Sequence, residues 1–276
     1  MEGVPFHLYV SESQSVKIGL IGNGAIARVV TIHCEASAGR LSIVGALVLP
    51  DDGDSAGQHP TVHDLSDLLA LAPDLVVECA GQGAVAQYGA AILSSGRDLM
   101  VISVGALADE TLQATLEAAG EAYGSKVIIP AGALAGLDAI TAAKSDGLTR
   151  VSLKTRKPPQ SWSGAPGVEG IDLSAITEAT AIFNGTAGEA ARAFPKNANV
   201  AAALALAGIG LDATEVQLIA DPSVSRNIHR IEAEGGFGRL TVEVEAEPSP
   251  NNPKTSHLAG LSIVRQLDRL TGVIVI

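Results

Sequence analysis

This sequence is poor in aromatic residues, which make up 3% of its 276 residues and include a single tryptophan. Positive charge is also scarce, with 18 basic residues against 30 acidic ones and a formal net charge of −12. The shortage of aromatics predicts an aliphatic, alanine-rich core, which suits helices packed closely on a parallel sheet. The excess of negative charge argues against nucleic acids and anionic membranes as partners, because both would repel the chain.

Cysteines and long apolar runs are rare as well. Cys34 falls in an expected helix and Cys79 at the end of an expected strand, so we do not expect a disulfide between them. Two unpaired thiols suit a reducing compartment, and we therefore expect a cytoplasmic protein. No apolar run reaches the length of a transmembrane helix. Residues 1–15 lack the charged and then apolar pattern of a signal peptide and are expected to be a short extension.

The most informative segment is VKIGLIGNGAIA at residues 16–27. An apolar run typical of a buried strand ends in G-x-G-x-x-A, and a helix-like segment follows. In a dinucleotide-binding turn, Gly22 permits the tight reversal, Gly24 lets a pyrophosphate approach the backbone, and Ala27 lets the helix pack close to the strand. The N–H groups at the start of the helix would face the phosphates. The segment predicts NAD or NADP as cofactor, with Gly22, Gly24, Ala25 and Ile26 as binding residues.

The choice between the two cofactors depends on the end of the second expected strand. Asp51 and Asp52 lie just beyond it, and an acid there would bond the 2′-hydroxyl of the ribose. No Arg or Lys lies nearby to hold a 2′-phosphate, so Asp51 favours NAD. The alternative is that these acids form a solvated turn.

Strand-like and helix-like segments alternate over the first half of the chain, which predicts a parallel sheet with right-handed crossovers. Strands are expected at residues 16–21, 41–49, 74–79, 98–103 and 126–129, with helices at 25–38, 65–71, 84–95 and 109–123. Asp109 is a plausible N-cap. The segment around His59 and His63 contains a proline and is expected to be a loop. With no third ligand in the pattern, we expect no metal site.

After residue 130 the pattern changes. Further strands are expected at residues 148–156, 179–184, 214–220, 226–234 and 238–247, the last two as a hairpin around Gly235 and Gly236. We therefore expect an α/β fold with an N-terminal Rossmann domain at 1–133 and an α+β domain with a largely antiparallel sheet at 134–253. A final helix at about 254–271 would pack back on the first domain, and residues 273–276 could form a terminal strand.

Three clusters in the second half carry candidate chemistry. On the strand at 226–234, Asn227 and His229 share a face, and a histidine suits proton transfer near neutral pH. A structural histidine is the alternative.

Asn197 stands at a helix start, where it could cap the helix or bond a carboxamide such as that of nicotinamide. At residues 252–256, backbone N–H groups, hydroxyls and a lysine could hold a carboxylate, or simply cap the last helix. A basic run at 154–157 is either a source of positive charge for an anionic substrate or a solvated strand end.

Together these segments resemble the L-aspartate dehydrogenase family. The resemblance spans nearly the whole chain after residue 15. The motifs that carry it are GLIGNGAI at 19–26, SVGAL at 103–107, PAGA at 130–133, GLDAI at 136–140, TRKPP at 155–159, FPKNANVA at 194–201, NIH at 227–229 and NPKTS at 252–256.

The resemblance implies oxidation of L-aspartate with NAD or NADP to iminosuccinate, which hydrolyses to oxaloacetate and ammonia or feeds NAD biosynthesis. It also implies that His229 is catalytic, that Asn197 contacts the nicotinamide, and that either Ala131 or Ala133 lines the cofactor. The remaining candidates, for binding a small dicarboxylic amino acid, are Lys196, Asn199, Asn227, Lys254, Thr255 and Ser256. A homodimer is expected, with the second sheets paired face to face. The alternatives are another oxidoreductase, such as a homoserine- or dihydrodipicolinate-type enzyme, and a nucleotide sensor without turnover.

Overall fold

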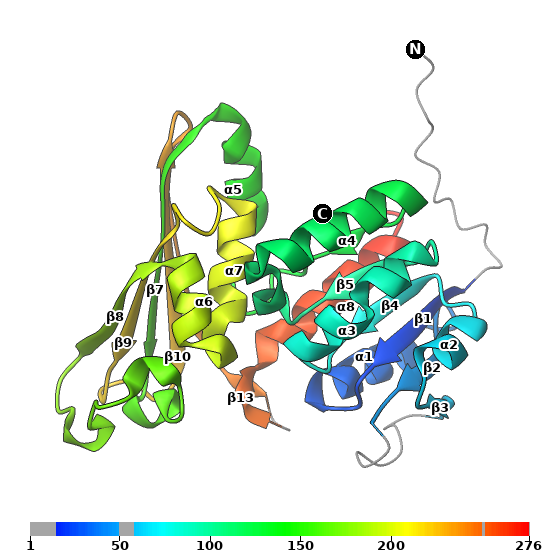
Figure 1. Cartoon of the computed structure of the whole chain (residues 1–276), viewed down its shortest axis with the longest axis horizontal. Helices are drawn as coiled ribbons and strands as arrows, with labels where there is room; N and C mark the ends of the chain where they lie inside the picture. Colours follow the sequence, from blue (N-terminus) through cyan, green and yellow to red (C-terminus); the bar gives the residue numbers. More distant parts are fainter. Residues whose placement is uncertain (1–14, 50–57, 250–251, 276) are drawn as a thin grey trace.

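The computed structural model describes residues 15–49, 58–249 and 252–275. Its first half is a six-stranded parallel sheet in the order β3-β2-β1-β4-β5-β6 (Figure 1). This is the strand order of a doubly wound dinucleotide-binding fold. The strands are β1 (Val16–Ile21), β2 (Leu41–Leu47), β3 (Thr61–Val62), β4 (Leu75–Glu78), β5 (Asp98–Val101) and β6 (Val127–Ile128).

Helices cover both faces of this sheet, because its central strands are apolar on both sides. One face packs against α1 (Ala25–Ala36) and α8 (His257–Thr271), the last helix of the chain. The other face packs against α2 (Leu65–Ala70), α3 (Gln82–Ser94) and α4 (Glu110–Tyr123). Asp109 caps α4 as expected, since its carboxylate accepts hydrogen bonds from the backbone of Thr111 and Leu112.

The second half is a five-stranded mixed sheet in the order β11-β10-β7-β9-β8. All neighbouring strands are antiparallel except β7 and β9, which are parallel. The strands are β7 (Leu148–Lys157), β8 (Thr180–Thr186), β9 (Glu215–Ala220), β10 (Asn227–Gly235) and β11 (Gly238–Ala246). The largely antiparallel sheet was expected, but the parallel pair was not.

In the part of the chain that the structure describes, helices cover one face of the second sheet and leave the other uncovered (Figure 1). Its apolar side packs against α5 (Leu137–Ala143), α6 (Ala187–Ala193) and α7 (Ala198–Ala207) around the buried rings of Trp162 and Phe194, which meet edge to face. In Figure 1, α6 and α7 lie between this sheet and the first half of the molecule. The opposite side, here called the open face, points away from the first half.

Three local predictions were wrong. Thr61 and Val62 form the edge strand β3 rather than a loop, since they pair with the end of β2. Residues 252–256 form strand β13 (Asn252–Ser256), paired with β12 (Pro248–Ser249), so the last helix starts at His257 and not at about 254. Residues 273–275 form no strand, and Val273 is fully exposed.

Candidate active site

The turn after β1 has the geometry that a dinucleotide requires. Gly22 has a φ of +95°, and a Cβ there would lie 3.1 Å from the Cα and Cβ atoms of Ala80. Gly24 precedes α1, and a Cβ there would meet no heavy atom within 4 Å. Among the described residues, no side chain caps the first turn of α1, and no acid lies in that turn, so its N–H groups can receive an anion. Open space at Gly24 and an uncapped helix start fit a pyrophosphate.

Glu78, which ends β4, organises the neighbouring loops. Its carboxylate is fully buried and accepts hydrogen bonds from the backbone N–H groups of Ala80 and Gly81. It also accepts from the N–H and hydroxyl groups of Ser103, in the loop after β5. Glu78 therefore holds together two loops at the carboxyl edge of the sheet, where ligands of this fold bind. Sequence reasoning missed it, although an acid closing an apolar strand was a visible signal.

His229 lies on β10 with its ring turned towards the helices, and only 3% of the residue is exposed. Its register partner on β7 is Thr155, and a hydrogen bond of 3.0 Å joins His229 Nδ1 to Thr155 Oγ1. Burial, and then the charge of Lys157, lower the pKa of His229 to about 3. The imidazole is therefore neutral, as a proton acceptor must be.

Lys157, at the end of β7, connects this strand to the start of α7. Its Nζ donates a hydrogen bond of 2.6 Å to Asn197 Oδ1 and lies 5.1 Å from the centre of the Trp162 ring. Burial lowers the pKa of Lys157 to about 8. Asn197 precedes α7 but makes no side-chain capping bond. The capping alternative for Asn197 is thus not realised, because its oxygen is bonded to Lys157 instead.

The start of α7 is fastened to the first half of the molecule. Gly105 N donates to Asn199 Oδ1 at 2.9 Å, and Gln82 Nε2 donates to the carbonyl of Pro195 at 2.9 Å. A Cβ on Gly105 would lie 2.9 Å from the Cβ of Ala198, so only glycine permits this approach. These contacts bring Asn197 to the nucleotide side of the molecule. Asn199, expected to bind substrate, bridges the two halves in this structure.

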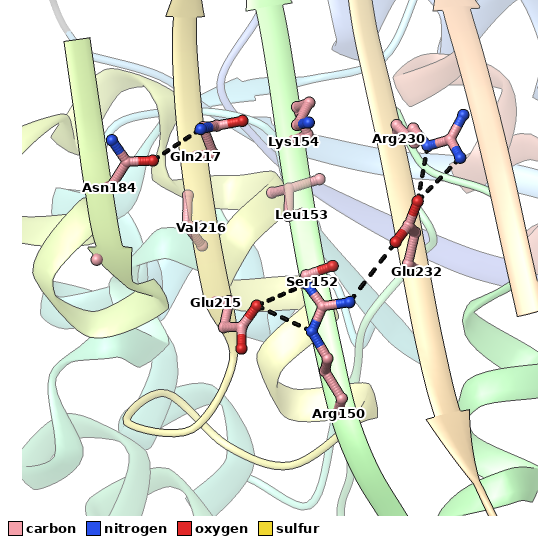
Figure 2. Close-up of a pocket in the computed structure, with 11 residues that line it drawn as sticks. Arg150, Ser152, Leu153, Lys154, Asn184, Glu215, Val216, Gln217, Arg230 and Glu232 are labelled. Atoms are coloured by element: carbon pink, nitrogen blue, oxygen red, sulfur yellow. Dashed lines mark hydrogen bonds and ion pairs between the residues drawn. The ribbon is translucent and has the colours of Figure 1, made fainter. Parts of the chain in front are cut away.

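The basic run at 154–157 divides between the two sides of the sheet. Lys154 lines a hollow on the open face, together with Arg150 and Arg230 (Figure 2). Arg156 Nε donates to the buried carboxylate of Asp221 at 2.9 Å. Within the run, only Thr155 and Lys157 contact the side that carries His229 and Asn197.

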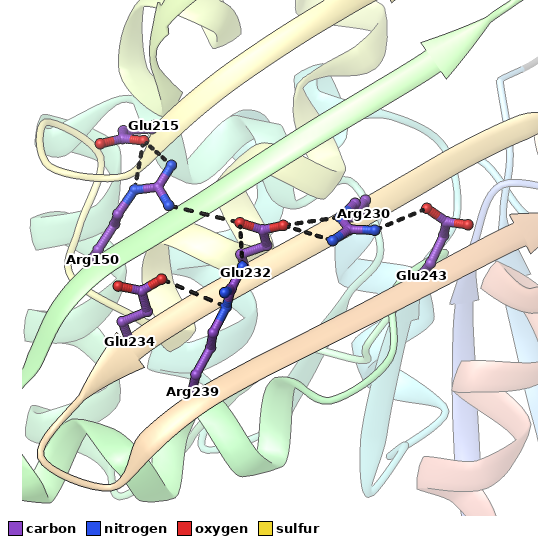
Figure 3. A network of polar contacts seen from close by, with 7 residues as sticks. All are labelled: Arg150, Glu215, Arg230, Glu232, Glu234, Arg239 and Glu243. Carbon is purple, nitrogen blue, oxygen red and sulfur yellow. Dashed lines mark hydrogen bonds and ion pairs between the residues drawn. The ribbon is translucent and has the colours of Figure 1, made fainter.

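The open face carries a ladder of ion pairs. Arg150 contacts Glu215 and Glu232, and Arg230 contacts Glu232 and Glu243 (Figure 3). Since these arginines already have carboxylate partners, the hollow beside them is a poor site for a dicarboxylate. The candidate site residues His229 and Asn197 lie on the opposite side of the sheet.

Comparison with known proteins assigns the chain to a family. Residues 138–270 match the family model described as aspartate dehydrogenase, C-terminal. The chain is 43% identical to the L-aspartate dehydrogenase of Ruegeria pomeroyi, with 93% of both chains covered. It is also 43% identical to that of Methanosarcina barkeri, over 92% of this chain and 97% of the relative. The chain belongs to the L-aspartate dehydrogenase family.

A solved structure of the aspartate dehydrogenase family supports the fold. The enzyme from Thermotoga maritima is 26% identical and matches with a TM-score of 0.76, over 95% of this chain and all of that one. Residues 19–130 match a model described as homoserine dehydrogenase, NAD binding domain. The resemblance, the fold class, NAD(P) as cofactor class and the assignment to oxidoreductases acting on a CH–NH₂ group are thereby confirmed.

The other predicted site residues of this family member lie as follows. Ala131 is half-buried and Ala133 is buried in the turn before α5, where the hydroxyl of Ser262 on α8 accepts from the backbone of Gly132. Ser256 Oγ is buried and has no hydrogen-bond partner among the described residues. Thr255 precedes it on β13, and Asn227 begins β10 on the side of His229. Asp51 and the side chains of Lys196 and Lys254 lie outside the described part of the chain.

Several expected absences concern the described residues alone. In that part of the chain, no group of three or more His, Cys, Asp or Glu side chains could hold a metal ion. No helix within it is long and apolar enough to cross a membrane. Cys34 and Cys79 are both free thiols.

Proposed function

We propose that this chain oxidises L-aspartate to iminosuccinate with NAD⁺ or NADP⁺, and that His229 is the catalytic base. The observation that carries the proposal is the neutral, buried imidazole of His229, held by Thr155 on the side of the sheet that adjoins the nucleotide-binding half. The iminosuccinate then hydrolyses to oxaloacetate and ammonia, or leaves as a precursor for NAD biosynthesis.

In this proposal, the dinucleotide is held by the turn after β1 and by Asn197. Gly22, Gly24, Ala25 and Ile26 would receive the pyrophosphate at the start of α1. Because an ammonium group can only donate, the oxygen of Asn197 must face Lys157, and its Nδ2 is left to donate to a nicotinamide carboxamide. Ala131, the more exposed of the two candidate alanines, is the better contact. When bound, NAD(P)⁺ supplies a hydride acceptor.

His229 would move the proton. When Nδ1 carries the hydrogen and donates it to Thr155 Oγ1, the lone pair of Nε2 is free to take a proton from the water that attacks the imine. In the reverse direction, Nε2–H would return that proton. A pKa of about 3 makes the free imidazole a weak base, and a bound dicarboxylate would raise this pKa through its negative charge.

The substrate carboxylates would lie between the two halves of the molecule. Ser256 supports this placement, since its buried hydroxyl lacks a partner among the described residues at the start of α8. Lys196, Asn199, Asn227, Lys254 and Thr255 are the other proposed contacts. We propose that residues 1–133 form the nucleotide-binding domain and 134–253 the substrate domain, with residues 254–256 adding substrate contacts from the segment that leads into α8. The preference for NAD, based on Asp51, stays a prediction.

An absorbance assay of the reduced nicotinamide tests the activity. The chain is mixed with L-aspartate and either NAD⁺ or NADP⁺, and the reverse reaction is followed with oxaloacetate, ammonia and the reduced cofactor. We expect turnover in both directions, with NAD preferred. Binding of the cofactor without any turnover would instead support a sensor.

We also propose a cytoplasmic homodimer in which the open faces of two second sheets meet. The two free thiols support the reducing compartment. The lack of helices on the open face supports the pairing, and its mixed arginines and glutamates suit a two-fold related copy. Light scattering should give twice the mass of one chain. Ser152→Trp, at the centre of this face, should yield monomers.

A further inference from the structure

Lys157 is the one lysine in the basic run that reaches the side of His229. It is partly buried, yet its Nζ has only two described contacts, the neutral oxygen of Asn197 and the face of the Trp162 ring. Among the described residues, no carboxylate lies within ion-pair distance of this ammonium group. A buried charge without a counter-ion is costly, and proteins normally pair it.

The other cations near this strand are already neutralised or face elsewhere. Arg156 is bonded to Asp221, and Lys154 lies on the open face. The positive charge of Lys157 also contributes to the low pKa of His229, so the two groups lie within electrostatic reach. A ligand that brings negative charge between them would satisfy the ammonium and make the imidazole a stronger base.

We propose that the ammonium group of Lys157 forms an ion pair with a carboxylate of the dicarboxylic amino acid and thereby sets the preference for dianionic substrates. The inference rests on the proposed function, because it places the substrate beside His229. Asn197 and Trp162 fix the position of the ammonium through a short hydrogen bond and a cation–π contact. The side chain is therefore held in place before the carboxylate arrives.

Calorimetric titration with two inert ligands tests this role. Succinate and butyrate have the same number of carbons, but only succinate has a second carboxylate, and neither carries the amine that is oxidised. With the NADH-bound enzyme, we expect succinate to bind more tightly than butyrate by about 10- to 100-fold, as for a charge-assisted hydrogen bond. Lys157→Met should reduce this ratio to near one. Lys154→Met, on the same strand but the open face, should preserve it.

Two further variants keep the test decisive. Lys157→Gln keeps a group that can hydrogen-bond to Asn197 but removes the charge. Its preference for succinate over butyrate should therefore disappear, as in Lys157→Met. Lys157→Arg retains the charge, so it should prefer succinate over butyrate more strongly than Lys157→Met or Lys157→Gln does. An unchanged ratio in Lys157→Met or Lys157→Gln overturns the proposal. So does a variant in which only the affinity for NADH falls, because Lys157 would then merely position Asn197.

Failure of the proposed function gives a different result. If the wild type binds succinate with the expected preference but does not oxidise aspartate, the activity is wrong and the dicarboxylate site remains. If it oxidises aspartate but Lys157→Gln keeps the preference, the activity remains and the role of Lys157 is wrong.

Discussion

The two sides of the second sheet differ in whether their charged side chains have partners of opposite charge. On the open face, Arg150, Arg230 and Glu232 belong to a ladder in which each arginine meets carboxylates of its own chain. On the helix-covered side, His229 is neutral and the ammonium of Lys157 faces an amide and an aromatic ring. The alternation of side chains along β7 and β10 places these two environments on opposite sides of the same strands.

This difference indicates on which side of the sheet a charged substrate would gain the most favourable electrostatic interaction. A ligand on the open face would compete with existing ion pairs between side chains that are partly or largely exposed in a single chain, where each pair contributes little. A carboxylate beside Lys157 would supply the first described counter-ion, in a partly buried place where the attraction is stronger than in water. The hollow of charged residues on the open face is therefore a worse candidate for catalysis than the side that carries His229 and Lys157.

The largest expected effect comes from removing the imidazole. His229→Ala should lower kcat by about 10²–10⁴-fold, the range of general acid–base catalysis. The affinity for NADH, measured by fluorescence titration, should stay near that of the wild type, because no cofactor contact is removed. Unchanged turnover would exclude His229 from the mechanism.

The same ring should make the native state sensitive to acid. The pKa of His229 is lowered from 6.5 to about 3, so below pH 6.5 the unfolded chain binds a proton that the folded chain does not. The stabilisation is fully present well above pH 6.5 and is lost as the pH falls through and below 6.5, by about 2 kcal/mol at pH 5. Urea unfolding of the wild type and of His229→Gln at several pH values measures this. Equal losses in both proteins would contradict the assigned burial.

A smaller effect should follow from removing the hydroxyl that holds the ring. Thr155→Val keeps the shape of the side chain but leaves His229 Nδ1 without its partner. We expect kcat to fall by about 10-fold, the equivalent of one hydrogen bond. Thr155→Ser restores the hydroxyl and serves as the matched control. A kcat equally low in both variants would point to packing rather than to the hydrogen bond.

The smallest effect should come from the open face. Glu232→Gln removes the carboxylate shared by Arg150, Arg230 and Arg239, yet kcat/KM should stay within about 2-fold of the wild type, as for surface substitutions away from a site. Steady-state kinetics measures this. A large loss of activity would mean that the two sides of the sheet are not independent.

The local sequence pattern was enough to predict much of the nucleotide-binding half of the molecule. The turn at Gly22 and Gly24 and the cap at Asp109 depend on residues within a few positions of one another. Strand β3 escaped prediction because two residues give no periodicity, and only their pairing with β2 makes them a strand. Strand β13 was not predicted because the sequence NPKTS at residues 252–256 resembles the start of a helix.

The site was harder to predict because its contacts join distant segments. Alternation along the strand placed His229, but its partner Thr155 lies 74 residues away in the chain. The bond between Lys157 and Asn197 depends on how α7 docks, which no spacing in the sequence reveals. Alternation along the expected strand could have divided the basic run between the two sides of the sheet, but which side faces the nucleotide half depends on how the helices dock.

The return of α8 to the first half of the molecule has a consequence for biogenesis. Ala259, Ile263 and Leu267 complete the core beside α1, and His33 on α1 contacts Asp268 on α8. The core of the nucleotide-binding half is therefore completed by residues that are synthesised after the whole second sheet. A nascent chain paused before α8 exposes the apolar side of β1 and α1, while its second sheet already has all five strands. We therefore expect the nucleotide-binding half to become fully packed only after α8 has been synthesised.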